Sequence, residues 1–122
     1  MATRYEVVIL NEQLRVDSTM VTGPKSVSQF SEKVARRHAR EFSAKWNKRA
    51  VAIPVGAHVV VLLRERIEVP HVRNGRPGYR WTEGYYVVDH LRGTIHTPVR
   101  RNEAFDLARQ LFGADCKIII GD

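Results

Sequence analysis

The sequence predicts an α+β fold, with an antiparallel or mixed sheet of about four to five strands and two helices packed on one face. Several segments alternate apolar and polar residues with period two, two others have the period of an amphipathic helix, and the two kinds are interspersed. The 122 residues contain no repeat and no low-complexity tract, so we expect a single domain over residues 1–122.

The chain is expected to open with a hairpin. Residues 4–10 alternate with period two, and Leu14, Val16 and Met20 continue the pattern. Residues 17–19 are poor strand formers, so the second strand has a loop as its alternative.

A long helix is expected from Ser26 to about Arg49. Ser26 and Gln29 have the spacing of a capping box, in which each side chain satisfies a free N–H group of the first turn. One face of this helix is apolar: Val27, Phe30, Val34, Ala35, His38, Ala39, Phe42 and Trp46. The opposite face is basic and polar: Lys33, Arg36, Arg37, Arg40, Asn47 and Lys48.

The second half of the chain begins with a long hairpin that joins residues 57–69 to residues 79–90. The Asn74-Gly75 pair between them is the strongest short signal for a hairpin turn. Residues 95–96 then form a short strand.

A second helix is expected to begin with Thr97 as N-cap and Pro98 at its first position, and to run to about Phe112. Gly113 stands where a left-handed cap belongs. The closing segment, residues 116–120, is continuously apolar, so we place it as a strand inside the sheet.

The net charge of +7 is unevenly distributed along the chain. Residues 25–49 hold eight Lys or Arg against two Glu, a net of +6. Such a concentration of positive charge attracts phosphate backbones, anionic lipid or an acidic protein.

Three clusters are candidates for binding a nucleic acid or another partner. Lys33, Arg36, Arg37, Arg40 and Lys48 form a stripe on the first helix that could follow a phosphate backbone, although a solvated outer face is the alternative. Arg73, Arg76 and Arg80 lie at the hairpin tip with Tyr79 and Trp81, an arrangement used in base stacking and in protein interfaces. The alternative there is that Trp81 and Tyr85 point inward as cross-strand core residues, while the arginines keep a long hairpin soluble.

The third cluster is Arg100 and Arg101 in the first turn of the second helix. The helix dipole disfavours positive charge at this end, and a bound anion would offset that cost.

No catalytic or cofactor-binding constellation is evident, so we expect a protein that is not an enzyme. Asp89 and His90 are neighbours in an extended segment, so their side chains point to opposite faces. The five histidines match no metal-ligand spacing, and no phosphate-binding glycine loop is present. We therefore expect no metal and no small-molecule cofactor.

The sequence thus favours a small basic module that binds nucleic acid, DNA or RNA, through the helix stripe and the hairpin tip. The alternative is an accessory or inhibitor module of the mobile-element type that docks on an acidic protein. The N-terminus does not read as a signal peptide and no apolar run approaches the roughly 18 residues of a membrane span, so we expect a cytoplasmic protein without a membrane partner.

Overall fold

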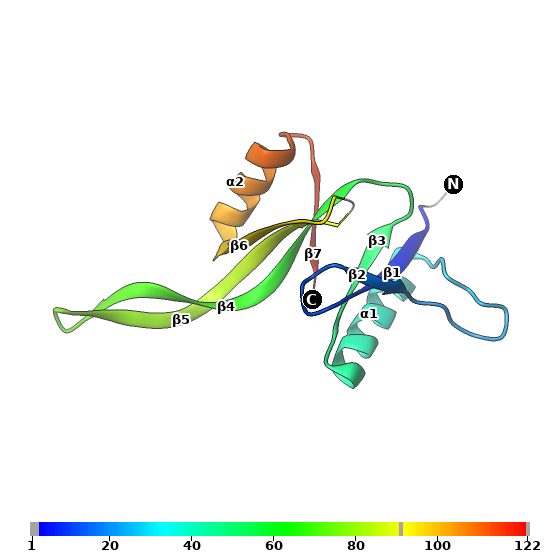
Figure 1. Cartoon of the computed structure of the whole chain (residues 1–122), viewed down its shortest axis with the longest axis horizontal. Helices are drawn as coiled ribbons and strands as arrows, with labels where there is room; N and C mark the ends of the chain where they lie inside the picture. Colours follow the sequence, from blue (N-terminus) through cyan, green and yellow to red (C-terminus); the bar gives the residue numbers. More distant parts are fainter. Residues whose placement is uncertain (1–2, 91, 122) are drawn as a thin grey trace.

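The computed structural model describes residues 3–90 and 92–121, and these form two sheets and two helices, which confirms the α+β class (Figure 1). The first sheet has the strand order β2-β1-β3, with β1 (Tyr5–Leu10), β2 (Val16–Thr19) and β3 (Arg49–Pro54). The second has the order β6-β5-β4-β7, with β4 (Val59–Arg73), β5 (Arg76–Asp89), β6 (Thr94–Arg100) and β7 (Lys117–Gly121). The helices are α1 (Glu32–Trp46) and α2 (Arg101–Phe112).

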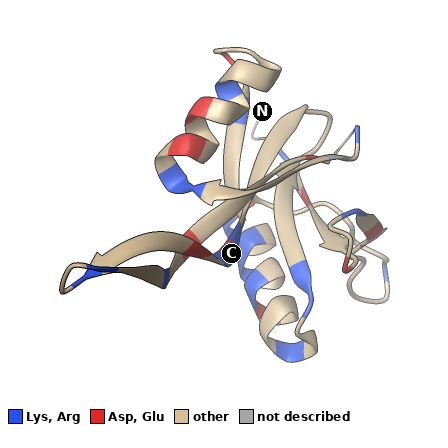
Figure 2. Cartoon of the chain, turned by 60° about the vertical axis from the view of Figure 1, so that its left-hand side comes forward, with Lys and Arg blue, Asp and Glu red and all other residues tan. Residues whose placement is uncertain are grey.

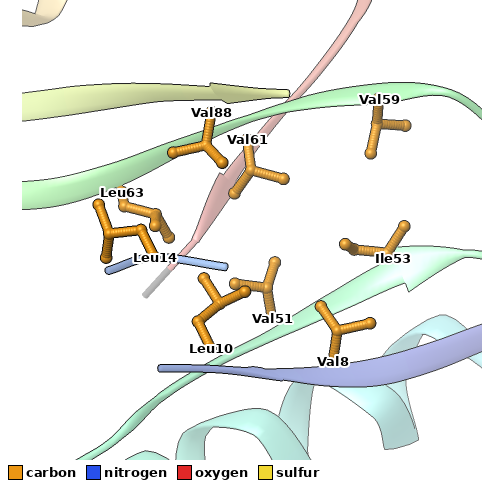
Figure 3. Packing of buried hydrophobic residues seen from close by; sticks show 9 residues of the cluster. All are labelled: Val8, Leu10, Leu14, Val51, Ile53, Val59, Val61, Leu63 and Val88. Atoms are coloured by element: carbon orange, nitrogen blue, oxygen red, sulfur yellow. The ribbon is translucent and has the colours of Figure 1, made fainter. Parts of the chain in front are cut away.

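The strands are divided between two sheets, so the expected single sheet with both helices on one face is corrected. Alternate residues of each central strand point to opposite sides, and both sides are apolar. Val8 of β1 and Val61 of β4 belong to a cluster between the two sheets (Figure 3). Val7 packs with Ala35 and Ala39 of α1, while Leu62 packs with Ala104 and Ala108 of α2. Each sheet therefore carries one helix on its outer face.

The first helix begins later than the sequence predicted. Its N-cap is Ser31, whose Oγ accepts a hydrogen bond from the Val34 N–H at 3.4 Å, and Ser26 instead lies in a turn with φ of 54°. Phe30 exchanges two backbone hydrogen bonds with Tyr5, each 2.7 Å long. This pairing holds the chain extended up to the cap, so the local capping signal at Ser26 is overridden.

The strand β3 was missed in the sequence. Its residues follow the predicted helix directly and include two alanines, which are poor strand formers. The helix in fact ends at Trp46, with Asn47 as a left-handed C-cap at φ 51°. Burial of both faces of β3, against α1 and against the other sheet, stabilises it as a strand.

The long hairpin is confirmed. Asn74 and Gly75 have φ values of 51° and 74°, the pattern of the two-residue turn that matches strand twist. The strands β4 and β5 pair in register from Val60↔Asp89 to Arg73↔Arg76. The neighbours β7 and β6 pair only with residues 59–63 and 84–89, so the rest of the hairpin extends beyond the sheet as a two-stranded ribbon (Figure 1). We call residues 66–83 the ribbon.

Two expectations near the second helix are corrected. Thr97 and Pro98 lie in β6, opposite an irregularity of the pairing between Tyr85 and Val87, and α2 begins at Arg101. A proline is tolerated there because β6 is an edge strand and the bulge needs no N–H group from it. Gly113 ends the helix with φ of 102° and ψ of 153°, which is not the left-handed conformation expected.

The closing strand β7 lies at the edge of its sheet and parallel to β4, not inside the sheet as predicted. Its apolar run has another cause. Ile118 and Ile120 pack toward α2, whereas Ile119 packs toward the other sheet. An edge strand that is covered on both faces has the same continuous apolar pattern as an interior strand.

Candidate nucleic-acid interface

The outer face of α1 carries Lys33, Arg36, Arg37 and Arg40, as the helical spacing predicts, while Ala35 and Ala39 face inward. All four cations are exposed, and Lys and Arg are seen along this helix in Figure 2. Arg36 forms an ion pair with Glu32 one turn earlier, at 2.8 Å. Among the described residues, the other three contact no carboxylate closely enough for an ion pair, so most of the stripe is free to bind an anion.

Lys48 is not part of this stripe. The helix ends two residues before it, and Lys48 lines a hollow of about 720 Å³ with Trp46 and Arg49. Three carboxylates lie in the wall of that hollow, Glu12, Asp17 and Glu65. Lys48 therefore lies beyond the end of α1, in a hollow that carboxylates also line.

A groove of about 510 Å³ joins segments that are distant in the sequence. Arg36 of α1, Arg64 of β4, Arg101 of α2 and Lys117 of β7 line it, with Glu32 as the only carboxylate among its described lining residues. Its floor lies between β3 and β7, which are the edge strands of the two sheets. We call this the basic groove.

The sequence did not single out Arg64 or Lys117. Arg64 stands at the root of the ribbon, where its Nε lies 3.3 Å from Glu83 Oε1, and Lys117 begins β7. Only the packing of the two sheets brings them beside Arg36. No local pattern in the sequence could have located them.

Arg100 and Arg101 mark the start of α2, near the root of the ribbon (Figure 2). Arg100 is the N-cap residue and forms no side-chain capping hydrogen bond. The Arg101 guanidinium lies 5.7 Å from the centre of the Phe105 ring, which keeps it along the helix surface. Of the two arginines, only Arg101 is in the wall of the basic groove among the described residues.

The ribbon separates the arginines of its tip from the aromatic residues. Strand alternation and the pairing register place Arg73, Arg76 and Arg80 on one face, which we call the arginine face. Tyr79 and Trp81 lie on the opposite face. The predicted cluster is therefore two surfaces rather than one interleaved set.

The arginine face is hollowed at its centre. Gly78 lies between Arg76 and Arg80 along β5 and opposite His71 of β4. These residues and Arg73 line an open hollow of about 780 Å³, together with Asn74, Pro77 and Tyr79.

The aromatic face is chemically different. The Arg66 guanidinium lies 5.3 Å from the centre of the Trp81 ring, and Glu68 is the direct cross-strand partner of Trp81. Glu83 lies two residues further along the same face. Trp81 and Tyr79 remain 56% and 73% exposed, so the alternative of an inward-facing core residue is wrong for Trp81. It is confirmed for Tyr85, which is 2% exposed and packs with Ala104 and Ala108 of α2.

Asp89 and His90 do not contact each other as a pair. Asp89 is fully buried, and its Oδ2 lies 2.9 Å from His58 Nε2 while its Oδ1 accepts a hydrogen bond from the Arg92 N–H at 3.2 Å. His90 Nδ1 instead lies 3.2 Å from the Val59 carbonyl oxygen. Over residues 3–90 and 92–121, no three side chains of the metal-binding types converge.

Comparison of the chain with protein-family models, with curated proteins and with solved structures gives no match. In the part of the chain that the structure describes, neither helix is long and apolar enough to cross a bilayer.

Proposed function

We propose that this chain is a nucleic-acid-binding module that contacts phosphates through the basic groove, the stripe of α1 and the ribbon. One observation carries the proposal: cations from four separate elements, Arg36, Arg64, Arg101 and Lys117, line a single groove with one carboxylate. A phosphate backbone needs such a row of cations, and its counterions are released when the cations replace them.

The arrangement of the elements supports an extended ligand. Arg36 of the α1 stripe lines the groove, and so does Arg64, which stands at the root of the ribbon. A strand of nucleic acid that follows the groove would thus meet cations over its whole length. Arg101, at the helix N-terminus, gains from a bound phosphate because that phosphate offsets the local positive potential.

The test is the salt dependence of binding, measured by fluorescence anisotropy with labelled DNA and RNA between about 50 and 200 mM salt. Replacing Arg101 and Lys117 together by Ala should lower the slope of log affinity against log salt by about 2, since each lost phosphate contact removes about 1. Lys25→Ala is the control, because Lys25 is exposed in the turn between Thr22 and Val27 and does not line the groove. Absence of binding to any nucleic acid at low salt would refute the proposal.

An acidic protein partner is the second candidate, favoured by the two strand edges at the groove. An extended acidic segment could add to β3 or β7 through main-chain hydrogen bonds and pair with the surrounding cations. A pulldown that recovers one protein at stoichiometric amounts, from protein that purifies free of nucleic acid, would favour this candidate over the first.

A further inference from the structure

The shape and the charge of the arginine face of the ribbon indicate which kind of nucleic acid it binds, beyond a general affinity for phosphate. From Ile67 to Arg73 the seven residues of β4 span about 23 Å, at about 3.3 Å per residue. Only β5 pairs with them; Val69 is buried, at 6% exposed, whereas residues 70–73 toward the tip are exposed or half-buried. The ribbon is therefore a two-stranded rod whose two faces differ.

Charge is uniform on the arginine face. Arg73 and Arg76 are direct cross-strand partners at the tip, and Arg80 lies opposite Val69. From Val69 to the tip, no carboxylate lies on this face among the described residues; Glu65 is the nearest along β4. All three arginines are exposed and form no ion pair with a described carboxylate.

Gly78 leaves the backbone of the arginine face accessible. A Cβ built on Gly78 would meet only the His71 carbonyl oxygen, at 3.7 Å, so the backbone between Arg76 and Arg80 is uncovered. A ligand surface can approach the backbone there while the arginines extend on both sides of it.

The aromatic face is unsuited to the same ligand. One side of the Trp81 ring is occupied by Arg66, Glu68 is the direct cross-strand partner of Trp81, and Glu83 lies two residues further along β5 in an ion pair with Arg64. The two carboxylates offset the charges of Arg64 and Arg66, so this face has no excess of positive charge to hold the phosphates of a strand whose bases stack on Trp81.

We propose, on the basis of the proposed function, that the ribbon lies in the major groove of double-stranded DNA with its arginine face toward the base edges. The major groove of B-form DNA is about 12 Å wide and admits a two-stranded ribbon, whereas the minor groove is about 6 Å wide. The major groove of an RNA duplex is deep and too narrow for side chains to read. Arginine pairs with the O6 and N7 acceptors of guanine, and the gap at Gly78 permits the close approach that this pairing needs.

The experiment compares four probes of one mixed sequence and length: a DNA duplex, an RNA duplex, single-stranded DNA, and the DNA duplex with 7-deazaguanine in place of guanine. Binding is measured by anisotropy at one salt concentration. The DNA duplex should bind most tightly, and removal of the guanine N7 should weaken it by about tenfold for one lost bidentate contact.

Variants on the two faces provide matched controls. Arg76→Ala combined with Arg80→Ala should weaken binding of the DNA duplex at least tenfold and abolish the difference between guanine and 7-deazaguanine. Gly78→Ala should weaken it while the circular dichroism spectrum stays unchanged. Val72→Ala, on the opposite face and 66% exposed, should leave the affinity unaltered.

The inference is overturned if the single strand or the RNA duplex binds as tightly as the DNA duplex, if 7-deazaguanine has no effect, or if Val72→Ala weakens binding more than the arginine variants do. In each of these cases the proposed function stands, because a nucleic acid is still bound. If none of the four probes binds, the proposed function fails as well.

Discussion

Ile67 fills the space above Gly84 at the point where the ribbon leaves the four-stranded sheet. A Cβ on Gly84 would come within 2.7 to 2.9 Å of three side-chain carbons of Ile67. Gly84 pairs with Glu65 and so lies diagonally across from Ile67 on the arginine side of the hairpin. This contact sets how β4 and β5 pack where the support of the other strands ends.

Gly84→Ala should therefore destabilise the protein by about 1 to 3 kcal/mol, the usual cost of overpacking. Ile67→Ala in the same chain should recover part of this loss because it removes the clashing carbons. The free energy of unfolding from urea titration of the two single variants and the double variant measures the coupling. If the destabilisations of the two single variants simply add up in the double variant, the contact between Ile67 and residue 84 is not the cause of the loss.

The stripe of α1 should contribute to binding through charge alone. Replacing Arg36, Arg37 and Arg40 together by Glu is expected to abolish binding of nucleic acid while the helix content by circular dichroism is kept, since all three side chains are exposed. Arg37→Glu and Lys25→Glu make equal changes of charge at exposed sites, and only the first should weaken binding. Unchanged binding in the triple variant would leave the stripe as a solvated face.

Loss of the Asp89 carboxylate should cost about 2 to 3 kcal/mol of stability, because Asp89→Ala removes a buried hydrogen bond from Arg92 N–H and the contact with His58. His58→Gln should cost less, since the His58 side chain is 41% exposed and the amide of Gln can still donate a hydrogen bond to the buried carboxylate. Thermal and urea unfolding measure both variants. Equal losses would mean that the pair with His58, rather than the backbone contact, is the main role of Asp89.

Tyr85 should make stability depend on alkaline pH. Burial, and then the hydrogen bond from its hydroxyl to Glu83 at 2.7 Å, raises the pKa of Tyr85 above its ordinary value of about 10. A raised pKa means that the neutral phenol stabilises the fold below pH about 10, and that this contribution is lost as pH rises through the folded-state pKa. Urea unfolding from pH 8 to 11 should show a smaller decline for Tyr85→Phe than for the wild type; parallel declines would contradict the assignment.

The elements that follow local patterns were predictable, and those set by distant contacts were not. Asn74-Gly75 specified its turn alone, and the face of α1 followed from its spacing. The capping signal at Ser26 failed because pairing of Phe30 with Tyr5 outweighs it. β7 was wrongly predicted inside the sheet because α2 covers one of its faces and the other sheet covers the second. An edge strand covered on both faces has the same continuous apolar sequence as an interior strand.

The candidate site was also predictable only in part. The cations of α1 and of the hairpin tip could be listed from the sequence, but the groove depends on Arg64 and Lys117, which only the stacking of the two sheets brings near Arg36. That Arg80 and Tyr79 lie on opposite faces of the hairpin could have been predicted from the sequence, since adjacent residues of a strand point to opposite faces. The two were grouped only because they are neighbours in the sequence.

The position of the edge strands β3 and β7 at the floor of the basic groove has a consequence for the behaviour of the chain in concentrated solution. Edge strands invite pairing with another molecule, and natural proteins often protect them with positive charge. Arg36, Arg101 and Lys117 stand beside these edges, so like charges repel when two copies approach groove to groove. Neutralising these cations, by mutation or by concentrated salt, would remove this repulsion and promote self-association and precipitation.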